Sequence, residues 1–512
     1  MAEAAERRGG AGLERLDVVI VGAGLSGIGA ARHLQQKCPR KTIAILEARQ
    51  AIGGTWDLFR YPGVRADSDM ATLGYAFRPW DDSKAIADGA AILKYIRGVA
   101  EEYRLDRLIQ FGCRLVRASW DSQEAGWTLE VERSDGEALR LACRFLFMCA
   151  GYYDYAQGFL PGWPGMDRFR GRIVHPQAWP DRLDCAGRRI VVIGSGATAV
   201  TLVPALAATA AHVTMLQRSP TFVVSRPATD PIAAWLMRRL PRRLAFALVR
   251  WKNIILQMYF YRLCRRKPEA ARRWILKSAQ DALGPEFDAS ALFGARYDPW
   301  DQRLCLVPDG DLFDAIRTGK ASVINGEIER FTERGLELKS GERLEANIVV
   351  TATGLVMRLM GGAEIAVGGA SVDVGAATTY KGVMYSDVPN LASAFGYPNA
   401  SWTLKCDLSA EYVCRLLGYM DRRGYAVCTP RLGAAPAGED PTLPLSSGYI
   451  ERARAILPKQ RLERPWRMNQ NYALDLIDLR LSPIEDGALE FRRLERARVR
   501  VRLGASSWKG SP

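Results

Sequence analysis

Two glycine-rich clusters in the chain have the spacing that binds the pyrophosphate of a dinucleotide. The first reads GAGLSG and supplies Gly22, Gly24 and Gly27. The middle glycine lets the backbone approach a pyrophosphate, which then lies at the positive end of the helix that follows. Glu47 stands twenty residues beyond Gly27, at the separation where an acid binds ribose hydroxyls. Because an acid favours a ribose without a phosphate, this cluster predicts a site for FAD or NAD.

The loop after this first site favours FAD. Residues 53–67 read GGTWDLFRYPGVRAD, which is too long for a simple turn and is rich in glycine and aromatic side chains. A loop of this kind can wrap a large planar ring. We therefore expect Gly54, Thr55, Trp56 and Asp67 to contact the flavin.

The second cluster, GSGATA, has alanine where the pattern has its last glycine, a substitution that dinucleotide sites permit. At the position that corresponds to Glu47, the chain has an arginine, Arg218. This reversal of charge indicates a 2′-phosphate, so the second site is expected to prefer NADPH. The residues expected to bind NADPH are Gly194, Ser195, Gly196, Ala197, Thr198, Arg218 and Ser219.

Both clusters lie between elements that are typical of a Rossmann fold. The runs LDVVIV (16–21) and RIVVI (189–193) predict buried parallel strands before the glycines. A helix and a second strand follow each cluster. Near residue 348 a further apolar run, IVVTATG, resembles the segment that returns such chains to a flavin domain. The predicted fold class is therefore α/β, with two Rossmann-like domains, the second inserted in the first, and a helical insert.

The predicted domain boundaries follow from these elements, in a chain of 512 residues that is too long for one ordinary core. An FAD-binding domain is interrupted by an NADPH-binding domain, which is itself interrupted by the basic insert. The expected ranges are FAD domain 1–155 and 346–512, the latter with a C-terminal extension, NADPH domain 156–225 and 298–345, and helical insert 226–297.

Cysteine and histidine usage favours a cytoplasmic protein without a metal site. The ten cysteines form no CxxC pair, and the three histidines are not at ligand spacing. Scattered cysteines without a disulfide framework are typical of a reducing compartment. The first ten residues lack the apolar region of a leader, and no apolar run is long enough to span a bilayer.

Most of the net charge of +15 lies in residues 233–277, which hold thirteen Lys and Arg and a single acidic residue, Glu269. No nucleic-acid binding module surrounds the segment, so nucleic acid is a poor explanation. The commoner explanation is a helical insert whose apolar face packs on the body and whose arginines are solvated. The alternative is peripheral contact with an anionic membrane surface, because basic amphipathic helices with Trp, Phe and Leu bind such surfaces.

Two longer motifs resemble the signatures of the type I Baeyer–Villiger monooxygenases, which are class B flavoprotein monooxygenases. FRGRIVHPQAWP (169–180) fits FxGxxxHxxxW[P/D], and GGTWDLFRYPGVRAD fits the family's second signature. FRYPGVRADSDM and GYPNASWTLKCDL (396–408) further resemble the mycobacterial ethionamide-activating subfamily. The resemblance covers nearly the whole chain.

The resemblance implies an FAD- and NADPH-dependent enzyme that uses O2 to form a C4a-peroxyflavin and converts ketones into esters, with sulfoxidation of thioethers or thioamides as a further activity. It carries the family's catalytic arginine over to Arg303, which Asp67 would orient. Many relatives have a lysine before this arginine, where this chain has Gln302, so Arg218 is expected to carry more of the 2′-phosphate binding. His175, in the first fingerprint, is expected to act with Trp179 by locking or switching the orientation of the two domains.

Two other functions stay open at this point. One is a flavin monooxygenase that oxygenates only sulfur or nitrogen, and the other is a non-catalytic nucleotide-binding protein at a membrane. The small-molecule substrate and the oligomeric state are not indicated by the sequence. The shape of the substrate pocket is expected to depend on the loops around 355–362 and 396–404 and on the helical insert.

Overall fold

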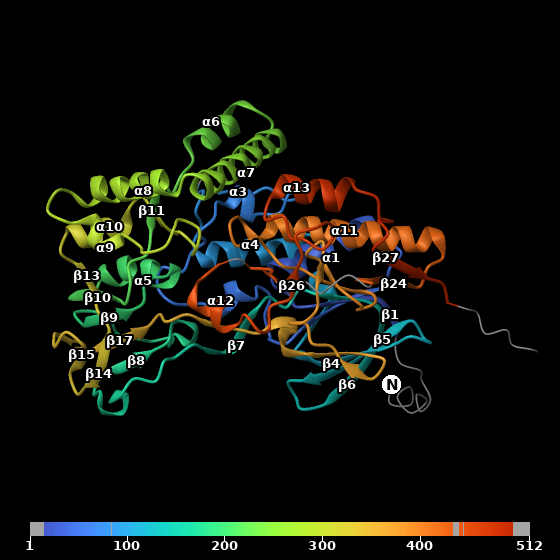
Figure 1. Cartoon of the computed structure of the whole chain (residues 1–512), viewed down its shortest axis with the longest axis horizontal. Coiled ribbons are helices and arrows are strands. Elements are labelled where there is room, and N and C mark those ends of the chain that lie inside the picture. Colours follow the sequence, from blue (N-terminus) through green and yellow to red (C-terminus); the bar gives the residue numbers. More distant parts are fainter. Residues whose placement is uncertain (1–14, 83, 434–439, 444, 495–512) are drawn as a thin grey trace, which may run out of the picture.

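The computed structural model describes residues 15–82, 84–433, 440–443 and 445–494. Residues 1–14, which include the ten residues for which the sequence predicts no leader, lie outside the described residues. The chain forms two lobes, each built on its own sheet, and a helical projection above them (Figure 1). The two predicted Rossmann-like domains of an α/β fold are thereby confirmed.

The larger lobe is organised around a nine-stranded sheet of order β20-β19-β4-β5-β6-β1-β2-β3, in which β23 also pairs with β6. The strands next to the first glycine cluster are parallel, and β4, β5 and β6 form an antiparallel meander. The bounds are β1 (Arg15–Val21), β2 (Ile43–Glu47), β3 (Ile109–Phe111), β4 (Cys113–Asp121), β5 (Gly126–Arg133), β6 (Ala138–Met148), β19 (Glu364–Val367), β20 (Ala370–Ser371) and β23 (Leu391–Ser393).

Three helices form one apolar core with the first sheet, namely α1 (Leu25–Lys37), α4 (Gly89–Glu102) and α11 (Trp402–Arg423). Strand β1 is apolar on both faces, as expected for a parallel strand that is covered on each side. Gly22 ends this strand with φ of +107°, and a Cβ there would lie 2.6 Å from the carbonyl oxygen of Cys149. The turn into α1 therefore requires glycine at this position.

The smaller lobe holds a five-stranded parallel sheet of order β13-β10-β9-β17-β8. Helices α5 (Ala197–Ala207) and α10 (Asp311–Arg317) share its core. Around it lie the strands β11 (Val223–Arg226), β12 (Cys305–Pro308), β14 (Ile328–Thr332), β15 (Gly335–Leu338) and β16 (Arg343–Glu345). The sheet strands are β8 (Arg172–Val174), β9 (Arg189–Ile193), β10 (His212–Gln217), β13 (Ala321–Asn325) and β17 (Ile348–Thr351).

The return to the first domain comes later than the boundary predicted at 345/346. The apolar run IVVT forms β17, which pairs with β9 and β8 of the second sheet. The chain re-enters the first sheet only at β19, which begins at Glu364. The boundary was placed too early in the sequence because a buried parallel strand has the same apolar run in either sheet. The pattern alone does not say which sheet the strand joins.

The two lobes are joined by two segments that run side by side. The outgoing segment is β7 (Tyr153–Gly158), and the returning one is β18 (Leu355–Met357); they pair antiparallel. A further hydrogen bond, 3.0 Å long, runs from the backbone N–H of Phe159 to the carbonyl of Gly354. The lobes are therefore connected through one two-stranded ribbon, which we call the connecting ribbon (Figure 1).

The predicted basic insert is helical and consists of α6 (Pro231–Arg239), α7 (Arg242–Arg266), α8 (Pro268–Leu283) and α9 (Ala289–Phe293). Helices α6 and α7 form the projection at the top of Figure 1, whereas α8 and α9 pack on the smaller lobe. One anchor of α7 to the larger lobe is Arg250, which is 6% exposed and donates hydrogen bonds of 2.8 and 2.7 Å to the carbonyls of Ala71 and Gly74. None of the described helices has the length and apolar composition to cross a bilayer.

Shorter elements complete the larger lobe. They are α2 (Thr55–Leu58), α3 (Met70–Leu73), α12 (Gly448–Arg452), α13 (Tyr472–Leu476), and the strand pairs β21 (Thr379–Tyr380) with β22 (Met384–Tyr385), β24 (Val427–Pro430) with β27 (Leu489–Arg492), and β25 (Asp440–Pro441) with β26 (Lys459–Gln460).

Candidate functional site

The first glycine cluster forms a cradle at the N-terminus of α1. Gly24 is the residue before the helix, and Gly27 lies in its first turn. A Cβ on Gly24 would lie 3.6 Å from the Cα of Gly54. The backbone of the first glycine cluster therefore faces the backbone of the 53–54 segment, with no side chain between them. Glu47 stands at the end of β2, where its carboxylate accepts hydrogen bonds from the backbone N–H of Ala23 (2.7 Å) and of Arg49 (2.9 Å).

Glu47 is 7% exposed, and burial raises its pKa, although the two N–H donors act in the opposite direction. Its carboxylate is thus fixed beside the glycine turn and can accept further hydrogen bonds from a ribose. Both features fit the adenosine diphosphate part of FAD.

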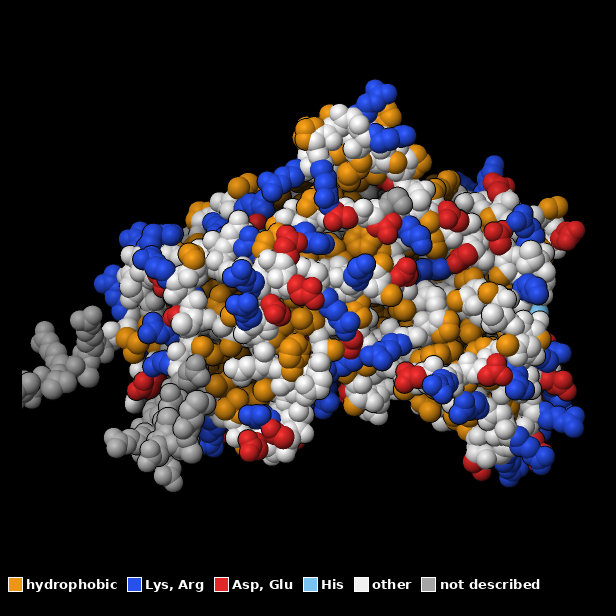
Figure 2. Space-filling view, turned by 180° about the vertical axis from the view of Figure 1, so that it is seen from behind, with side chains coloured by type: hydrophobic (Ala, Val, Ile, Leu, Met, Phe, Trp, Pro, Cys, Tyr) orange, Lys and Arg blue, Asp and Glu red, His pale blue; other side chains and the backbone are white. Residues whose placement is uncertain are grey.

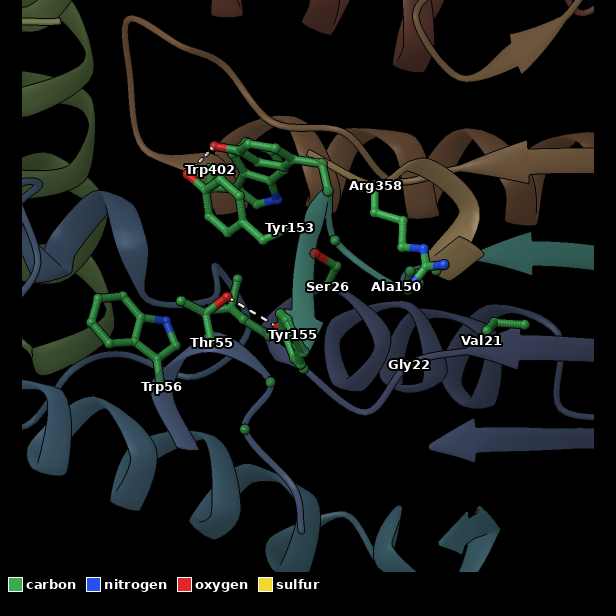
Figure 3. Close-up of a pocket in the computed structure, with 18 of the residues that line it drawn as sticks. Val21, Gly22, Ser26, Thr55, Trp56, Ala150, Tyr153, Tyr155, Arg358 and Trp402 are labelled. Carbon is green, nitrogen blue, oxygen red and sulfur yellow. Dashed lines mark hydrogen bonds between the residues drawn. The ribbon is translucent and has the colours of Figure 1, made fainter. Parts of the chain in front are cut away.

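A cavity of about 400 Å³ extends from this cradle to the Asp67–Arg303 pair (Figure 3). The predicted flavin residues Gly54, Thr55 and Trp56 line it. The hydroxyls of Thr55 and Tyr155 are 3.1 Å apart across it, as the dashed line in Figure 3 marks. We call this space the first cavity. Other residues that line it are Gly22, Glu47, Asp67, Tyr152, Tyr153, Arg358, Tyr397 and Trp402.

Asp67 and Arg303 meet at the far end of the first cavity, although they are 236 positions apart. Nε of Arg303 lies 2.8 Å from Oδ2 of Asp67, and Nη2 donates to Oδ1 at 2.9 Å. The pairing is bidentate, which fixes the plane of the guanidinium. Burial lowers the pKa of Arg303, but the charge of Asp67 and the neighbouring tyrosines raise it further, so the net shift is upward. Arg303 is therefore a fixed cation.

One nitrogen of this guanidinium remains available. Nε and Nη2 both bond to Asp67, whereas Nη1 has no hydrogen-bond partner among the described residues. The Arg303 side chain is 32% exposed, and it lines the first cavity. An anionic oxygen in this space could accept a hydrogen bond from Nη1 without breaking the pair with Asp67.

A tyrosine cluster beside the pair was not predicted from the sequence. Tyr152 and Tyr153 lie at the start of the outgoing segment, a few residues after β6, and their hydroxyls are 2.8 Å apart. Trp402 stacks on Tyr152 at a ring-centroid distance of 4.7 Å. Burial raises the pKa of both tyrosines, so they stay protonated. The signal that could have found them is the YYDY run at the end of a buried strand, where ligand-binding residues of open α/β sheets gather.

A second cavity, of about 290 Å³, adjoins the first. The two share Asp67, Ser68, Arg303 and Ala400, so the guanidinium lies at their junction. One wall of the second cavity is α7 of the basic insert, through Lys252, Asn253, Leu256, Gln257 and Phe260. Loops around 355–362 and 396–404 contribute lining residues to one or both cavities, as expected from the sequence.

The second glycine cluster lies on the smaller lobe. Gly194 has φ of +133°, and a Cβ there would lie 2.4 Å from the carbonyl oxygen of Ala352. Gly196 precedes α5, whose first residues are Ala197 and Thr198, and a Cβ on Gly196 would meet nothing within 4 Å. The backbone is therefore open to a pyrophosphate at the helix N-terminus.

Arg218 and Ser219 follow β10 and are exposed. The hydroxyl of Ser195 lies 2.8 Å from that of Thr221 and donates to the carbonyl of Ser219 at 3.3 Å. These contacts tie the glycine turn to the segment that carries Arg218. The cluster thus has an open phosphate cradle and a nearby exposed cation, which fits a phosphorylated dinucleotide.

His175 lies away from both cavities and contacts the connecting ribbon instead. Its Nδ1 accepts a hydrogen bond from the N–H of Gln177 at 3.2 Å, so its Nε2 carries the proton that is donated to the carbonyl of Gly354, also at 3.2 Å. A Cβ on Gly158, in the outgoing strand, would lie 1.9 Å from the imidazole. Burial lowers the pKa of His175, although the bond to Gly354 opposes the shift. The imidazole is therefore packed against both segments that join the lobes, at Gly158 and at Gly354.

Comparison with known proteins gives close relatives along nearly the whole chain. The flavin-binding monooxygenase-like family model matches residues 16–266. The FAD-containing monooxygenase EthA of Mycobacterium tuberculosis is 51% identical over 481 residues, which cover 94% of this chain and 98% of EthA. The putative FAD-containing monooxygenase MymA of the same species is 49% identical over 485 residues, covering 93% and 98%.

Solved structures share the fold at lower identity. An oxidized steroid monooxygenase bound to NADP matches with a TM-score of 0.74 and 21% identity, over 94% of this chain and 100% of its own. A cyclohexanone monooxygenase from Rhodococcus sp. Phi1 bound to NADP+ matches with a TM-score of 0.66 and 20% identity, over 82% and 87% of the two chains. These solved structures and this chain therefore share the two-lobe fold over most of the length of the chain.

Proposed function

Since the chain belongs to the family of FAD-containing monooxygenases that includes EthA and MymA, we propose that it uses FAD, NADPH and O2 to insert one oxygen atom into a ketone, giving an ester. The observation that carries the proposal is the bidentate Asp67–Arg303 pair at the junction of two cavities. Oxygenation of sulfur in thioethers or thioamides is the second activity of the same site.

In this proposal the first cavity holds FAD. Gly22, Gly24 and the N-terminus of α1 bind its pyrophosphate, and Glu47 accepts hydrogen bonds from its ribose. The loop with Gly54, Thr55 and Trp56 bounds the ring system. When bound, the flavin supplies the activation of O2 by electrons from NADPH.

Arg303 has an electrostatic role in this reaction. Its Nη1 donates to the oxygen that attacks the carbonyl carbon and then stabilises the negative charge on the tetrahedral adduct. A guanidinium suits this task because it stays charged at any working pH and does not give up its proton to the attacking oxygen. Asp67 holds the guanidinium in place, and the rigid pair needs no reorganisation as charge develops.

The tyrosine cluster favours sulfur oxygenation as the second activity. Tyr152 and Tyr153 line the first cavity near Arg303, and their raised pKa keeps both hydroxyls protonated. A hydroxyl that donates to the transferred oxygen makes this oxygen more electrophilic. Electrophilic oxygen reacts with soft sulfur lone pairs, whereas addition to a ketone needs a nucleophilic oxygen.

The experiment that tests the function is product analysis with a mixed panel of linear ketones, cyclic ketones and aryl sulfides. NADPH consumption is followed in parallel on the purified, yellow protein. Esters from at least one ketone class, formed in step with NADPH, are expected. Sulfoxides without any ester would make sulfur oxygenation the main function, and a colourless protein that consumes no NADPH would favour the non-catalytic alternative.

The Arg218→Ala variant should bind NADPH more weakly and leave NADH almost unaffected. Arg218 is the cation beside the open phosphate cradle, so its removal loses a charged hydrogen bond of about 1–3 kcal/mol to the 2′-phosphate. The measurement is the Michaelis constant for each cofactor, with flavin reduction as the readout. An equal rise for NADH and NADPH would mean that Arg218 contacts a part that both cofactors share.

His175 is proposed as a positioning residue of the connecting ribbon. His175→Ala should retain FAD and raise the fraction of NADPH that is consumed without oxygenated product, because the ribbon then lacks the imidazole that fixes Gly354. The readout is hydrogen peroxide released per NADPH. His175→Gln, whose amide can donate to the same carbonyl, should restore part of the coupling. Unchanged coupling, or loss of FAD, would reduce His175 to a folding role.

A further inference from the structure

Helix α7 has an exposed apolar stripe, in which one residue, Trp251, also packs edge-on against Tyr472 at a ring-centroid distance of 5.8 Å. The stripe consists of Leu244, Leu248, Trp251, Ile255 and Tyr259, at spacings of four, three, four and four residues, which place them on one helix face. Their exposed fractions range from 44% to 65%. The opposite side of α7 buries Ala245, Phe246, Val249 and Ile254. A helix that only packs on the body needs one apolar face, and α7 has two.

Helix α6 extends this surface beyond the body. None of its residues is buried, and Ile232, Trp235 and Met237 are exposed by 55%, 49% and 38%. In Figure 2 the projection that holds this part of the insert stands clear of the surface and carries hydrophobic and basic side chains together. Contiguous apolar surface of this kind marks an interaction site in a water-soluble protein. We call α6 and α7 together the hairpin.

The charged residues of the hairpin itself, 231–266, are all basic. Arg239 lies over the ring of Trp235 at 5.5 Å, and Arg262 and Arg266 continue the stripe at the C-terminal end of α7. Within the part of the chain that the structure describes, several basic residues of the insert have no salt bridge to a carboxylate. They are Arg238, Arg239, Arg243, Arg262, Arg266, Lys267, Arg273 and Lys277.

We propose that the hairpin binds an anionic phospholipid surface. The exposed stripe and Trp235 enter the boundary between headgroups and acyl chains, and the unpaired arginines contact the phosphates. A nucleic acid would use the charge but leave the apolar stripe in water. A second copy of the chain would cover the stripe but bring two strongly basic surfaces together. The lipid surface is the partner that satisfies both features.

The same helix connects this surface to the reaction site. Asn253, Gln257 and Phe260 line the second cavity, and Leu256 lines it while being 50% exposed. Leu256 therefore lies at a rim of the cavity, next to the stripe. If the proposed monooxygenase function holds, the site opens beside the bilayer, and its substrates are apolar ketones or sulfides that dissolve in the membrane.

Vesicle co-sedimentation tests the binding without turnover. The full chain is mixed at low salt with vesicles of phosphatidylcholine alone or of equal parts phosphatidylcholine and phosphatidylglycerol. Sedimentation with the anionic vesicles, and its loss as salt is raised, is the expected result. Equal binding to both vesicle types, or none to either, would overturn the proposal.

Two variants separate the apolar and basic contributions. The triple change Trp235→Glu, Leu248→Glu and Ile255→Glu should lower the partition coefficient about a hundredfold or more. Arg262→Gln with Arg266→Gln should lower it about fivefold per arginine. The control is Val116→Glu, on β4 at the opposite side of the molecule, where an exposed apolar residue (39%) outside the hairpin is replaced and no effect on binding is expected.

Light scattering after size exclusion excludes the alternative partner. If the triple variant turns a dimer into a monomer while vesicle binding stays unchanged, the stripe is a contact between copies and the proposal is wrong.

The substrate class is tested by a separate measurement. A long-chain ketone presented in anionic vesicles should be oxidised more slowly by the triple variant, and a water-soluble ketone at the wild-type rate. Failure of both ketones with wild-type protein would refute the proposed ketone oxidation and leave the vesicle result intact.

Discussion

Replacing Arg303 with alanine is expected to abolish ester formation while NADPH consumption continues. The guanidinium is the fixed cation at the junction of the two cavities, and its Nη1 is available to the reacting oxygen. Removing one preorganised donor to a developing oxyanion costs on the order of 100- to 1,000-fold in rate. FAD retention should be unchanged, because the cradle at Gly24 and Glu47 is far along the cavity from Arg303.

The measurement compares ester yield and hydrogen peroxide release per NADPH consumed. Arg303→Lys keeps the charge but cannot bond to Asp67 through two nitrogens in one plane, so it should recover only part of the activity. The matched control is Arg265→Ala, which breaks another Arg–Asp pair, with Asp301, outside both cavities. Normal ester formation by Arg303→Ala would show that the catalytic arginine has been assigned wrongly.

The Lys405→Ala variant should lose about 3–5 kcal/mol of unfolding free energy, because it leaves a buried carboxylate without its cation. Lys405 is 0% exposed, and its Nζ lies 3.0 Å from Oδ2 of Asp475. The same carboxylate accepts hydrogen bonds from the hydroxyl of Tyr397 at 2.5 Å and from the amide of Asn469 at 2.9 Å. The network joins α11 to the segment around Asp475, and Tyr397 lines the first cavity.

Chemical denaturation followed by flavin fluorescence and circular dichroism measures this loss. The control is Lys339→Ala, which removes a Lys–Glu pair of similar length, 2.7 Å to Glu327, whose side chains are 60% and 52% exposed. Water replaces an exposed partner, so this variant should unfold at the wild-type midpoint. Equal effects of the two substitutions would mean that the buried pair contributes little beyond a surface pair.

Short sequence patterns predicted those parts of the site that are formed by residues close together in the sequence. Each glycine cluster lies within a single strand–turn–helix unit, so β1 and β9 have nearly the bounds expected from the sequence, and a helix follows each of them as expected. The contact between Asp67 and Arg303 crosses 236 positions. It was expected only because two long motifs resembled a known family, since no periodicity links such distant residues. The roles of both residues stay predictions.

The features that were missed depend on tertiary packing. Nothing local distinguishes β17 from a strand of the first sheet, and so the domain boundary was displaced. Tyr152 is held at the site by stacking on Trp402, the first residue of α11, which is 250 positions away in the sequence. The helical insert was expected to shape the pocket, but which of its residues form the wall of the second cavity depends on how α7 docks through Arg250 on Ala71 and Gly74.

The connecting ribbon also determines how the smaller lobe can turn. Because the outgoing and returning strands run side by side, a twist of the ribbon need not stretch either strand. Arg250 also holds the insert to the larger lobe through backbone carbonyls and lies 3.6 Å from the carboxylate of Asp407. Further ion pairs cross between the two halves of the molecule, namely Arg65 with Asp311 and Arg303 with Asp67. A turn of the smaller lobe about the ribbon therefore has to break the pair that holds Arg303 or carry Asp67 with it.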